Sequence, residues 1–371
     1  MHKFLQSTSR TLPLRPPTDL LRHIRTNTHA KPLTTYATFQ YLENRPEYQH
    51  TKPYHINIPA WSLPPGQQCN EVSVPHSNIP VQGLRGQLDA FTLDRNGFAV
   101  AVEDKRGPDS LYDCLAYEEY MEHQRHQKRL FGAVESFLRR KMEGVEDVVA
   151  FSNQIRRRDP QFPALPRGSD ASKPQPVQGV HVDFTPDCAQ SEIGGALVER
   201  GYTTLKGRRW QVIRHVSPSP LLCQVCFAAT VVLIMNVPST WKPLFGPLQD
   251  WPLALLDYTS LDNERDLIAS DNVYTHVIRE TYNVIHNEKH RWYYLENQQP
   301  DEVLLFKTFD SRATKGNARV CPHAAFEDPL APRNARPRES FECQAVVIYP
   351  EGSMEGNSYD EVLPSESTRP E

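Results

Sequence analysis

The chain has 371 residues, enough for one large or two medium domains with an ample hydrophobic core. Apolar residues make up 39% of it and charged residues 23%, the balance of a soluble globular protein. A formal net charge of −4 argues against a nucleic-acid-binding or membrane-surface protein, so we expect no nucleic acid and no membrane among its partners.

The first 34 residues form a basic stretch, with six Lys or Arg residues and one acid, Asp19. This composition resembles a mitochondrial transit peptide. Pro13, Pro16 and Pro17, however, would interrupt the amphipathic helix of such a peptide. We therefore expect residues 1–34 to be a disordered tail of a cytoplasmic protein, with mitochondrial targeting as the alternative.

Seven cysteines are scattered along the chain, an odd number that favours reduced thiols in an intracellular compartment. Cys223 and Cys226 are spaced as Cys-x-x-Cys but lack the second pair of a structural zinc site. They lie in the longest apolar run, Leu221 to Met235, which contains Gln224 and is too short to span a bilayer. No membrane helix is predicted.

Residues 35–105 are expected to form strands and turns, and the Arg-Asn-Gly sequence at 95–97 is typical of a hairpin turn. From 111 to 142 the pattern becomes helical, with apolar residues on one helix face at Leu130, Val134, Phe137 and Leu138. Gly144 follows as a stop signal. One or two helices packed against a sheet are predicted here.

Residues 145–159 begin as a strand and end with Arg156, Arg157 and Arg158. These arginines could bind an anion, but we expect a solvated sheet edge. Residues 160–178 contain five prolines and are interpreted as a loop.

Beyond residue 180 the chain alternates short strands with turns. The predicted strands lie within 209–213, 252–261, 282–295, 302–311, 319–328 and 340–349. With the strand at 145 and the one around 181, they favour an eight-stranded double-sheet jelly roll. We therefore predict a mainly β fold with packing helices (α+β), with a cupin-like double-stranded β-helix core over about 145–350. It would belong to a single domain, 35–350, followed by a disordered tail, 351–371.

The segment 176–187, "PVQGVHVDFTPD", places His181 and Asp183 two residues apart. In a strand, such residues point to the same face. An imidazole and a carboxylate on one face are two of the three ligands of the facial triad that binds ferrous iron.

The third ligand of such a triad is a histidine from a distant strand. We favour His323 in "VCPHAAFED", because "PRESFECQAVVIY" follows it and opens the final strand with Arg338 and Ser340. A guanidinium and a hydroxyl that face the same way could jointly hold a carboxylate. This order of elements is that of iron oxygenases that use 2-oxoglutarate. The alternative is "HNEKH", where His286, Glu288 and His290 would share one strand face as a separate metal site.

Five stretches carry a resemblance to a known family: "VHVDFT", "PLFGPLQDWPLALLDYTSLDNERDL", "HRWYYLENQQPDEVLLFKTFDS", "PHAAFEDP" and "PRESFE". Together they resemble the AsaB-like hydroxylase/desaturase family, which includes fungal gibberellin desaturase-like and cephem methoxylase-like proteins. The resemblance extends from "RGQLDAFTLDRNGF" at 85–98 to Tyr349.

This resemblance implies an iron(II)/2-oxoglutarate-dependent oxygenase that hydroxylates or desaturates a small secondary metabolite, such as a polyketide or terpenoid, with molecular oxygen. It implies Fe(II) ligands at His181, Asp183 and His323. It also implies that Arg338 and Ser340 bind the distal carboxylate of 2-oxoglutarate, while Arg333 and Arg336, in a proline-rich loop, are expected to be solvated.

Other residues receive weaker assignments. His290, Trp292 and Tyr294 are candidates for the wall of the substrate pocket, although core packing is the default for aromatic residues in a strand. Lys307 could pair with an acid or contact the co-substrate, and the sequence does not decide between them.

The chain departs from the family pattern in two places. An apolar segment, 214–235, intervenes where relatives continue directly, and we interpret it as a translated intron or an unusual loop. Gln344 stands where relatives often carry Arg. If that Arg were the family's carboxylate anchor, this chain would lack the anchor for 2-oxoglutarate. The alternative hypothesis is therefore a catalytically impaired or non-catalytic jelly-roll partner protein.

Overall fold

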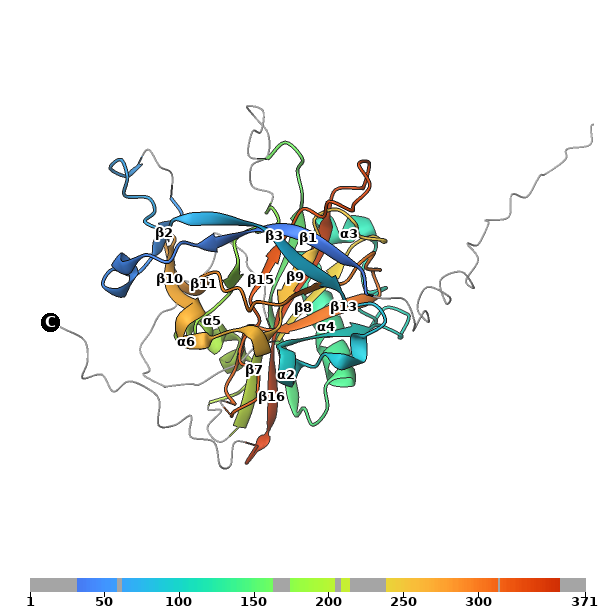
Figure 1. The fold of residues 1–371 in the computed structure, drawn as a ribbon. Coiled ribbons are helices and arrows are strands. Elements are labelled where there is room, and N and C mark those ends of the chain that lie inside the picture. Colours follow the sequence, from blue (N-terminus) through green and yellow to red (C-terminus); the bar gives the residue numbers. More distant parts are fainter. Residues whose placement is uncertain are drawn as a thin grey trace, which may run out of the picture.

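The computed structural model describes residues 32–58, 62–162, 174–203, 208–213, 238–312 and 314–353. The strands of this part form two sheets, with helices against them (Figure 1). The nine-stranded sheet has the order β1 (Thr34–Leu42), β3 (Ser73–Gly83), β12 (Trp292–Tyr294), β9 (Leu253–Leu256), β15 (His323–Ala325), β6 (His181–Val182), β11 (Ile278–Val284), β10 (Leu267–Val273) and β2 (Tyr54–Ile56). The prediction of a mainly β fold with packing helices is confirmed.

The second sheet has seven strands. Six follow the order β14 (Phe309–Asp310), β7 (Arg208–Ile213), β16 (Glu339–Glu351), β8 (Pro238–Pro243), β13 (Glu302–Lys307) and β4 (Phe98–Val102). The seventh, β5 (Asp147–Arg157), pairs with the other edge of β16 along ten residue pairs. β16 therefore has partners along both of its edges, and the predicted strands within 145–159 and 340–349 are confirmed.

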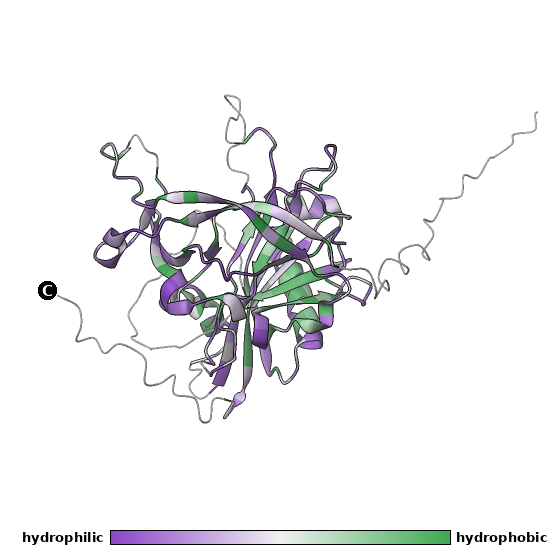
Figure 2. Cartoon of the chain, viewed as in Figure 1, coloured by the Kyte–Doolittle hydropathy of each residue, from purple (hydrophilic) through white to green (hydrophobic). Residues whose placement is uncertain are grey.

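Helix α4 (Gln127–Lys141) covers the second sheet, and the shorter α3 (Tyr117–Met121) precedes it. The predicted apolar face of α4 is buried in one cluster with strand residues, among them Val148, Phe341 and Val347. Figure 2 shows this concentration of apolar residues at the centre of the molecule and polar residues in the outer loops. The predicted packing of helices on a sheet is confirmed.

The predicted hairpin at 95–97 is wrong. Residues Leu93–Asn96 form a short helix, α2, after the 3₁₀ turn η3 (Leu88–Ala90). The hydroxyl of Thr92 accepts a hydrogen bond from the amide of Arg95, which caps the helix start. Gly97 ends the helix with φ of 84°, a left-handed conformation that glycine adopts without strain. Only the strand after it, β4, forms as expected.

Helix α5 (Pro186–Glu199) was also not predicted from the sequence. It follows β6 in a region interpreted as strands and turns. Thr185 caps it by accepting a hydrogen bond from the amide of Cys188, and Pro186 occupies its first turn. This cap-and-proline signal is present in the sequence "FTPD" and could have been used to find the helix. The remaining short helices are η1 (Pro46–Gln49), η4 (Tyr258–Ser260) and α6 (Asn263–Asp266).

Strands β7 and β8 lie end to end along the same edge of β16. Ile213, the last residue of β7, pairs with Ala345, and Ser239 in β8 pairs with the next residue of β16, Gln344. β7 and β8 therefore pair with β16 as a single continuous strand would. The chain between 213 and 239 is an insertion at the point where the two strands meet. The apolar segment 214–235 itself lies outside the described residues, as do most of both tails expected to be disordered.

The described helices include none that is both long and apolar enough to cross a membrane. The expected single domain, 35–350, stays a prediction.

Candidate active site

The structure brings His181, Asp183 and His323 together. His181 in β6 pairs directly with His323 in β15, so both side chains lie on one face of the nine-stranded sheet. Asp183 follows two residues after His181 and is buried. The potential ligand atoms of the three side chains all lie within 4.8 Å of one another.

The hydrogen bonds of the two histidines suit a metal ligand. Nδ1 of His181 lies 2.8 Å from the carbonyl oxygen of Gly179, and Nδ1 of His323 lies 3.0 Å from that of Cys321. Because a carbonyl oxygen can only accept, each Nδ1 carries the proton, and in the neutral ring the lone pair is on Nε2. Such a backbone contact commonly orients metal-binding histidines.

Both Nε2 atoms face Asp183, at 3.2 Å from Oδ1 for His181 and 3.5 Å from Oδ2 for His323. A lone pair that faces a carboxylate oxygen is repelled unless a proton or a cation lies between them. A metal ion would contact all three groups at once, and two imidazoles with one carboxylate are the donor set of non-haem iron(II). The residues present therefore fit an iron(II) ion.

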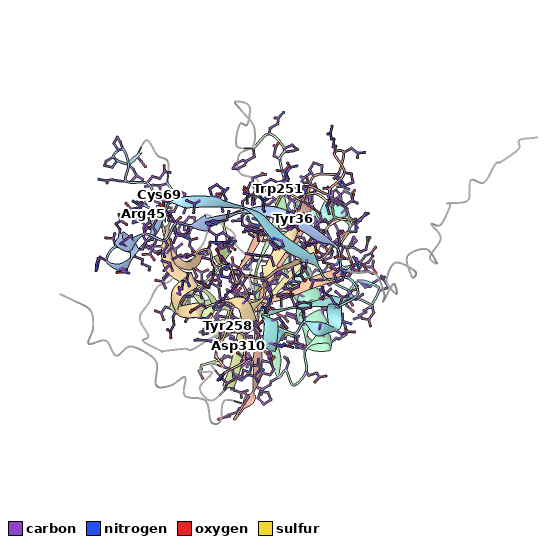
Figure 3. All side chains as sticks on the ribbon, viewed as in Figure 1. Tyr36, Arg45, Cys69, Trp251, Tyr258 and Asp310 are labelled. Carbon is purple, nitrogen blue, oxygen red and sulfur yellow. The ribbon has the colours of Figure 1, made fainter. Side chains whose placement is uncertain are left out.

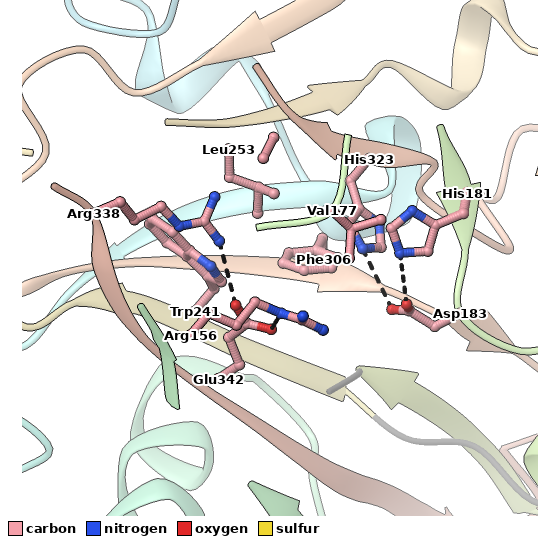
Figure 4. A pocket seen from close by; sticks show the side chains of 11 residues that line it. Arg156, Val177, His181, Asp183, Trp241, Leu253, Phe306, His323, Arg338 and Glu342 are labelled. Atoms are coloured by element: carbon pink, nitrogen blue, oxygen red, sulfur yellow. Dashed lines mark hydrogen bonds and ion pairs between the residues drawn. The ribbon is translucent and has the colours of Figure 1, made fainter. Parts of the chain in front are cut away.

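A cavity lies beside these residues, between the two sheets (Figure 4). His181, Asp183 and His323 form one end of it, and Arg338, Arg156 and Glu342 form the other. Phe306 lies between the two ends, with its ring centroid 4.7 Å from that of His323. The cavity thus has two polar ends separated by an aromatic wall.

Arg338 is 1% exposed, and its guanidinium is held in place by several contacts. Nε donates to Oγ of Ser340 at 3.2 Å, and Nη1 donates to the carbonyl of Trp251 at 3.0 Å. The guanidinium also lies 4.9 Å from the ring centroid of Trp241. Burial lowers the pKa of Arg338 to about 10, so the group is still charged at neutral pH.

Glu342 bridges Arg338 to a second arginine that sequence reasoning assigned to a solvated edge. Arg156 is buried, and its Nε donates to Oε2 of Glu342 at 2.9 Å, while Nη2 of Arg338 donates to Oε1 at 3.3 Å. The solvated-edge prediction is wrong for Arg156, because Arg156 pairs with Ser340 and therefore faces the cavity. Arg157 pairs with Glu339 and forms an ion pair with it on the opposite side of the strand.

The two arginines of the preceding loop are exposed, as expected. Arg333 is on the surface, and Arg336 forms an ion pair with Glu339 at 2.8 Å while 52% of its side chain is accessible. Gln344 is buried farther along β16 and is not among the residues that line the cavity. Within the described chain, the buried cations at this cavity are therefore Arg338 and Arg156.

The structure does not bring His290, Trp292 and Tyr294 to this cavity. Tyr293 pairs with Leu255, which pairs with His323, so Tyr293 shares the face of the triad and its two neighbours in β12 face the other way. Trp292 and Tyr294 belong to a buried cluster with Phe39 and Phe326 on that other face. A pocket role for them stays a prediction, and their contacts favour core packing.

The alternative "HNEKH" site does not form as predicted. β11 ends at Val284 and β12 begins at Trp292, so His286, Glu288 and His290 lie in a turn and not on one strand face. His290 contacts Asp266 through Nε2 at 3.0 Å and the hydroxyl of Tyr41 through Nδ1 at 3.2 Å. Both ring nitrogens are thus used by protein groups.

Lys307 pairs with acids. It is fully buried, and its Nζ donates to Asp94 at 2.9 Å and to Asp310 at 2.5 Å. Arg209 contacts the same two carboxylates. Lys307 therefore belongs to an ion-pair network outside the cavity, which settles the alternative that the sequence left open.

The chain is similar to a protein family and to several known proteins. A family model described as YDMC, Oxidoreductase/YMDC permease-like domain, matches residues 39–220 and 227–348. The Fe(II)/2-oxoglutarate-dependent dioxygenase nvfI of Aspergillus novofumigatus is 27% identical over 76% of this chain and 87% of its own length. The gibberellin cluster GA4 desaturase of Gibberella fujikuroi is 22% identical over 81% of this chain and 94% of its own length.

A shorter match is closer in sequence. The aspirochlorine biosynthesis protein N of Aspergillus oryzae is 40% identical over 119 residues, which cover 31% of this chain and about half of that protein, 48%. Among solved structures, the iron and alpha-ketoglutarate-dependent endoperoxidase NvfI superposes with a TM-score of 0.62 at 24% identity, over 85% of this chain and 98% of its own. This similarity confirms the predicted cupin-like jelly-roll fold.

Proposed function

The chain belongs to the oxidoreductase family whose model matches it over residues 39–220 and 227–348, and we propose that it is an iron(II)/2-oxoglutarate-dependent oxygenase that hydroxylates or desaturates a small secondary metabolite. Several relatives bear the names dioxygenase, hydroxylase or desaturase, which agrees with the resemblance read from the sequence. The observation that carries the proposal is the convergence of His181, Asp183 and His323 at one end of a cavity.

Each end of the cavity has its own part in this proposal. His181, Asp183 and His323 would hold iron(II). Bound iron(II) supplies the oxidation, in which 2-oxoglutarate and O2 yield succinate and CO2 while hydrogen is removed from a C–H bond of the substrate. Arg338, with Ser340 beside it, would bind the distal carboxylate of 2-oxoglutarate, because a buried guanidinium forms charge-assisted hydrogen bonds with carboxylates.

The charges of the cavity support this co-substrate. Arg156 and Arg338 carry two positive charges, and Glu342 and Asp183 carry two negative ones. A ferrous ion adds two positive charges, which a dianion such as 2-oxoglutarate neutralises. Uncompensated charge is costly in a buried site, so the lining residues favour a dianionic partner once iron is bound.

The aromatic and aliphatic wall of the cavity would keep water from the reacting centre. Phe306, Trp241 and Leu253 line it between the two polar ends (Figure 4). Apolar walls suit an uncharged hydrocarbon skeleton, and we propose a polyketide, a terpenoid or a similar metabolite as the substrate class. No finding favours the alternative of a non-catalytic partner protein.

The experiment compares His181→Ala with His286→Ala, a histidine of the rival cluster in the turn before β12. Each purified variant is reconstituted anaerobically with iron(II), and bound iron is counted before oxygen is admitted with 2-oxoglutarate and candidate metabolites. We expect His181→Ala to lose both iron and succinate formation, and His286→Ala to keep both. Iron binding and succinate formation in His181→Ala at the wild-type level would refute the proposal.

A further inference from the structure

A second group of potential metal ligands lies at the far edge of the nine-stranded sheet. His55 is in the edge strand β2, and an isolated antiparallel bridge pairs it with Cys69. Glu71 follows two residues after Cys69. The imidazole, thiol and carboxylate atoms of these residues all lie within 4.8 Å of one another, and all three residues are partly buried. Figure 3 labels Cys69 beside β2, at the edge of the sheet.

This group has the same construction as the triad in the cavity. In each case, two ligands are two residues apart in one extended segment, and a histidine lies directly opposite the first of them on a neighbouring strand. His181 and Asp183 with His323 correspond in this way to Cys69 and Glu71 with His55. Cross-strand pairing and the period of two therefore direct three donors to one point in both places.

The carboxylate of Glu71 is held in position by groups from two other strands. Its Oε1 accepts hydrogen bonds from the hydroxyl of Ser270 in β10 and, at 2.7 Å, from Nδ2 of Asn283 in β11. Contacts of this kind orient the carboxylate ligands of metal sites. Asn283 pairs directly with His181 in β6, so Glu71 reaches the same face of the sheet as the triad, although two strands, β11 and β10, lie between β6 and β2.

From this geometry we propose that His55, Cys69 and Glu71 form a second metal site, specific for zinc. A thiolate with an imidazole and a carboxylate is a zinc donor set, whereas the facial triad of non-haem iron(II) oxygenases contains no sulfur ligand. Ligands of a tetrahedral zinc ion are roughly 3.5 Å apart, given Zn–S and Zn–N bonds of about 2.3 and 2.0 Å. The three donors, which all lie within 4.8 Å of one another, would have to approach by about 1 Å to reach this spacing.

The zinc ion would have a structural role, because it would join the segment at 69–71 to the edge strand β2. The amide of Ile56 already donates to the carbonyl of Gln68, and the amide of Asn70 to the carbonyl of Tyr54, and a metal ion would add a side-chain link to these backbone bonds.

The test uses cobalt(II) as a spectroscopic probe for zinc in the full chain after removal of metal by a chelator. Cobalt bound to a thiolate absorbs strongly in the near ultraviolet by charge transfer, and cobalt bound to His181, Asp183 and His323 does not. We expect two cobalt ions per chain, and a charge-transfer band that one equivalent of zinc abolishes. Cys69→Ser should lose the band and one ion, while His181→Ala should lose one ion and keep the band.

The matched control is the double variant Cys223→Ser/Cys226→Ser, which removes the other close pair of thiols in the sequence. It should keep the band. Loss of the band in this control, with the band intact in Cys69→Ser, would overturn the proposal, as would a wild-type protein that binds a single metal ion. His55→Ala keeps the thiol and should weaken the band. This result would distinguish a metal site of several ligands from cobalt bound by a reactive cysteine alone.

Discussion

His181 and His323 lie directly opposite each other on adjacent antiparallel strands, with their ring centroids 4.5 Å apart. Each ring is fixed by its own contact to a backbone carbonyl two residues away, at Gly179 and Cys321. The backbone of the nine-stranded sheet thus sets the position and the tautomer of both histidines before a metal ion arrives.

Replacement of the proposed carboxylate anchor should affect the co-substrate and not the metal. Loss of a buried bidentate contact to a carboxylate costs about 2–5 kcal/mol, so Arg338→Ala should weaken 2-oxoglutarate binding by about two to three orders of magnitude. Iron binding should change little. Titration of 2-oxoglutarate into the anaerobic iron complex measures the first quantity, and metal analysis measures the second.

Arg336→Ala is the matched control, because Arg336 lies two residues away and is exposed. It should bind 2-oxoglutarate like the wild type. The opposite result, weak binding in Arg336→Ala and normal binding in Arg338→Ala, would place the anchor in the loop.

The bridge between the two arginines predicts a stability effect that the co-substrate reverses. In Glu342→Gln, Arg156 and Arg338 would face each other in a buried site without their shared carboxylate, which should lower the free energy of unfolding by about 3 kcal/mol. A bound dianion restores the balance of charge, so 2-oxoglutarate should raise the melting temperature of this variant more than that of the wild type.

Thermal unfolding of both iron-loaded proteins, with and without 2-oxoglutarate, provides the measurement. Equal stabilisation of the two proteins would show that the co-substrate does not bind near Glu342.

Lys242 predicts an alkaline pH dependence of stability. It is buried in β8 with its Nζ 3.4 Å from the hydroxyl of Tyr120, and burial lowers its pKa to about 8 from 10.5. Between these two pH values the unfolded chain binds a proton that the folded chain has released, so the stability contributed by this group rises with pH. Below pH 8 both states are protonated and the cost of the buried charge is fully present.

Lys242→Met should therefore increase the free energy of unfolding at pH 7 by about 3 kcal/mol, the equivalent of the pKa shift, and should flatten the rise between pH 8 and 10. Urea unfolding of both proteins at a series of pH values tests this. An unchanged slope in the variant would assign the pH dependence to other groups.

The register of β7 and β8 predicts that the chain between them is dispensable. Because Ile213 and Ser239 pair with consecutive residues of β16, deletion of residues 214–238 would join them at the spacing of a continuous strand. The shortened protein should fold, bind iron, and gain about 1–3 kcal/mol of stability, since closing a 25-residue connection has an entropic cost that a direct peptide bond lacks.

Chemical unfolding and metal analysis of the deletion variant give the outcome. A variant that fails to fold would show that the segment is an integral part of this chain. Sequencing of the mature transcript independently decides whether residues 214–235 are a translated intron.

The sequence predicted those parts of the site that depend on local periodicity. His181 and Asp183 follow from a period of two, and Ser340 beside Arg338 follows in the same way. Arg156 could not be assigned, because a run of three arginines contains no sign of which one faces inward; only its register with Ser340 decides. Glu342 follows on the same face by the same period of two, but its bridging role carries no sequence signal, because it depends on Arg156 from another strand.

Other differences come from turns that override strand periodicity. "YNVIHNEKHRWYYL" alternates like one strand, yet Asn287 bonds with Asp266 and the chain turns there, so the histidines around it do not share a face. At 92–97 the capping hydroxyl of Thr92 outweighs the hairpin signal. In both cases a short polar side chain bonds where the periodic pattern assumes a continuous ladder.

The wide separation of the three proposed iron ligands along the chain has a consequence for how the protein is made. During synthesis, His181 and Asp183 leave the ribosome long before His323, and β6 has both of its sheet neighbours, β11 and β15, still to come. A nascent chain that ends before β15 can offer iron two ligands at most. With these ligands, metal uptake would follow translation of β15, and bound iron would mark the chains whose nine-stranded sheet is complete.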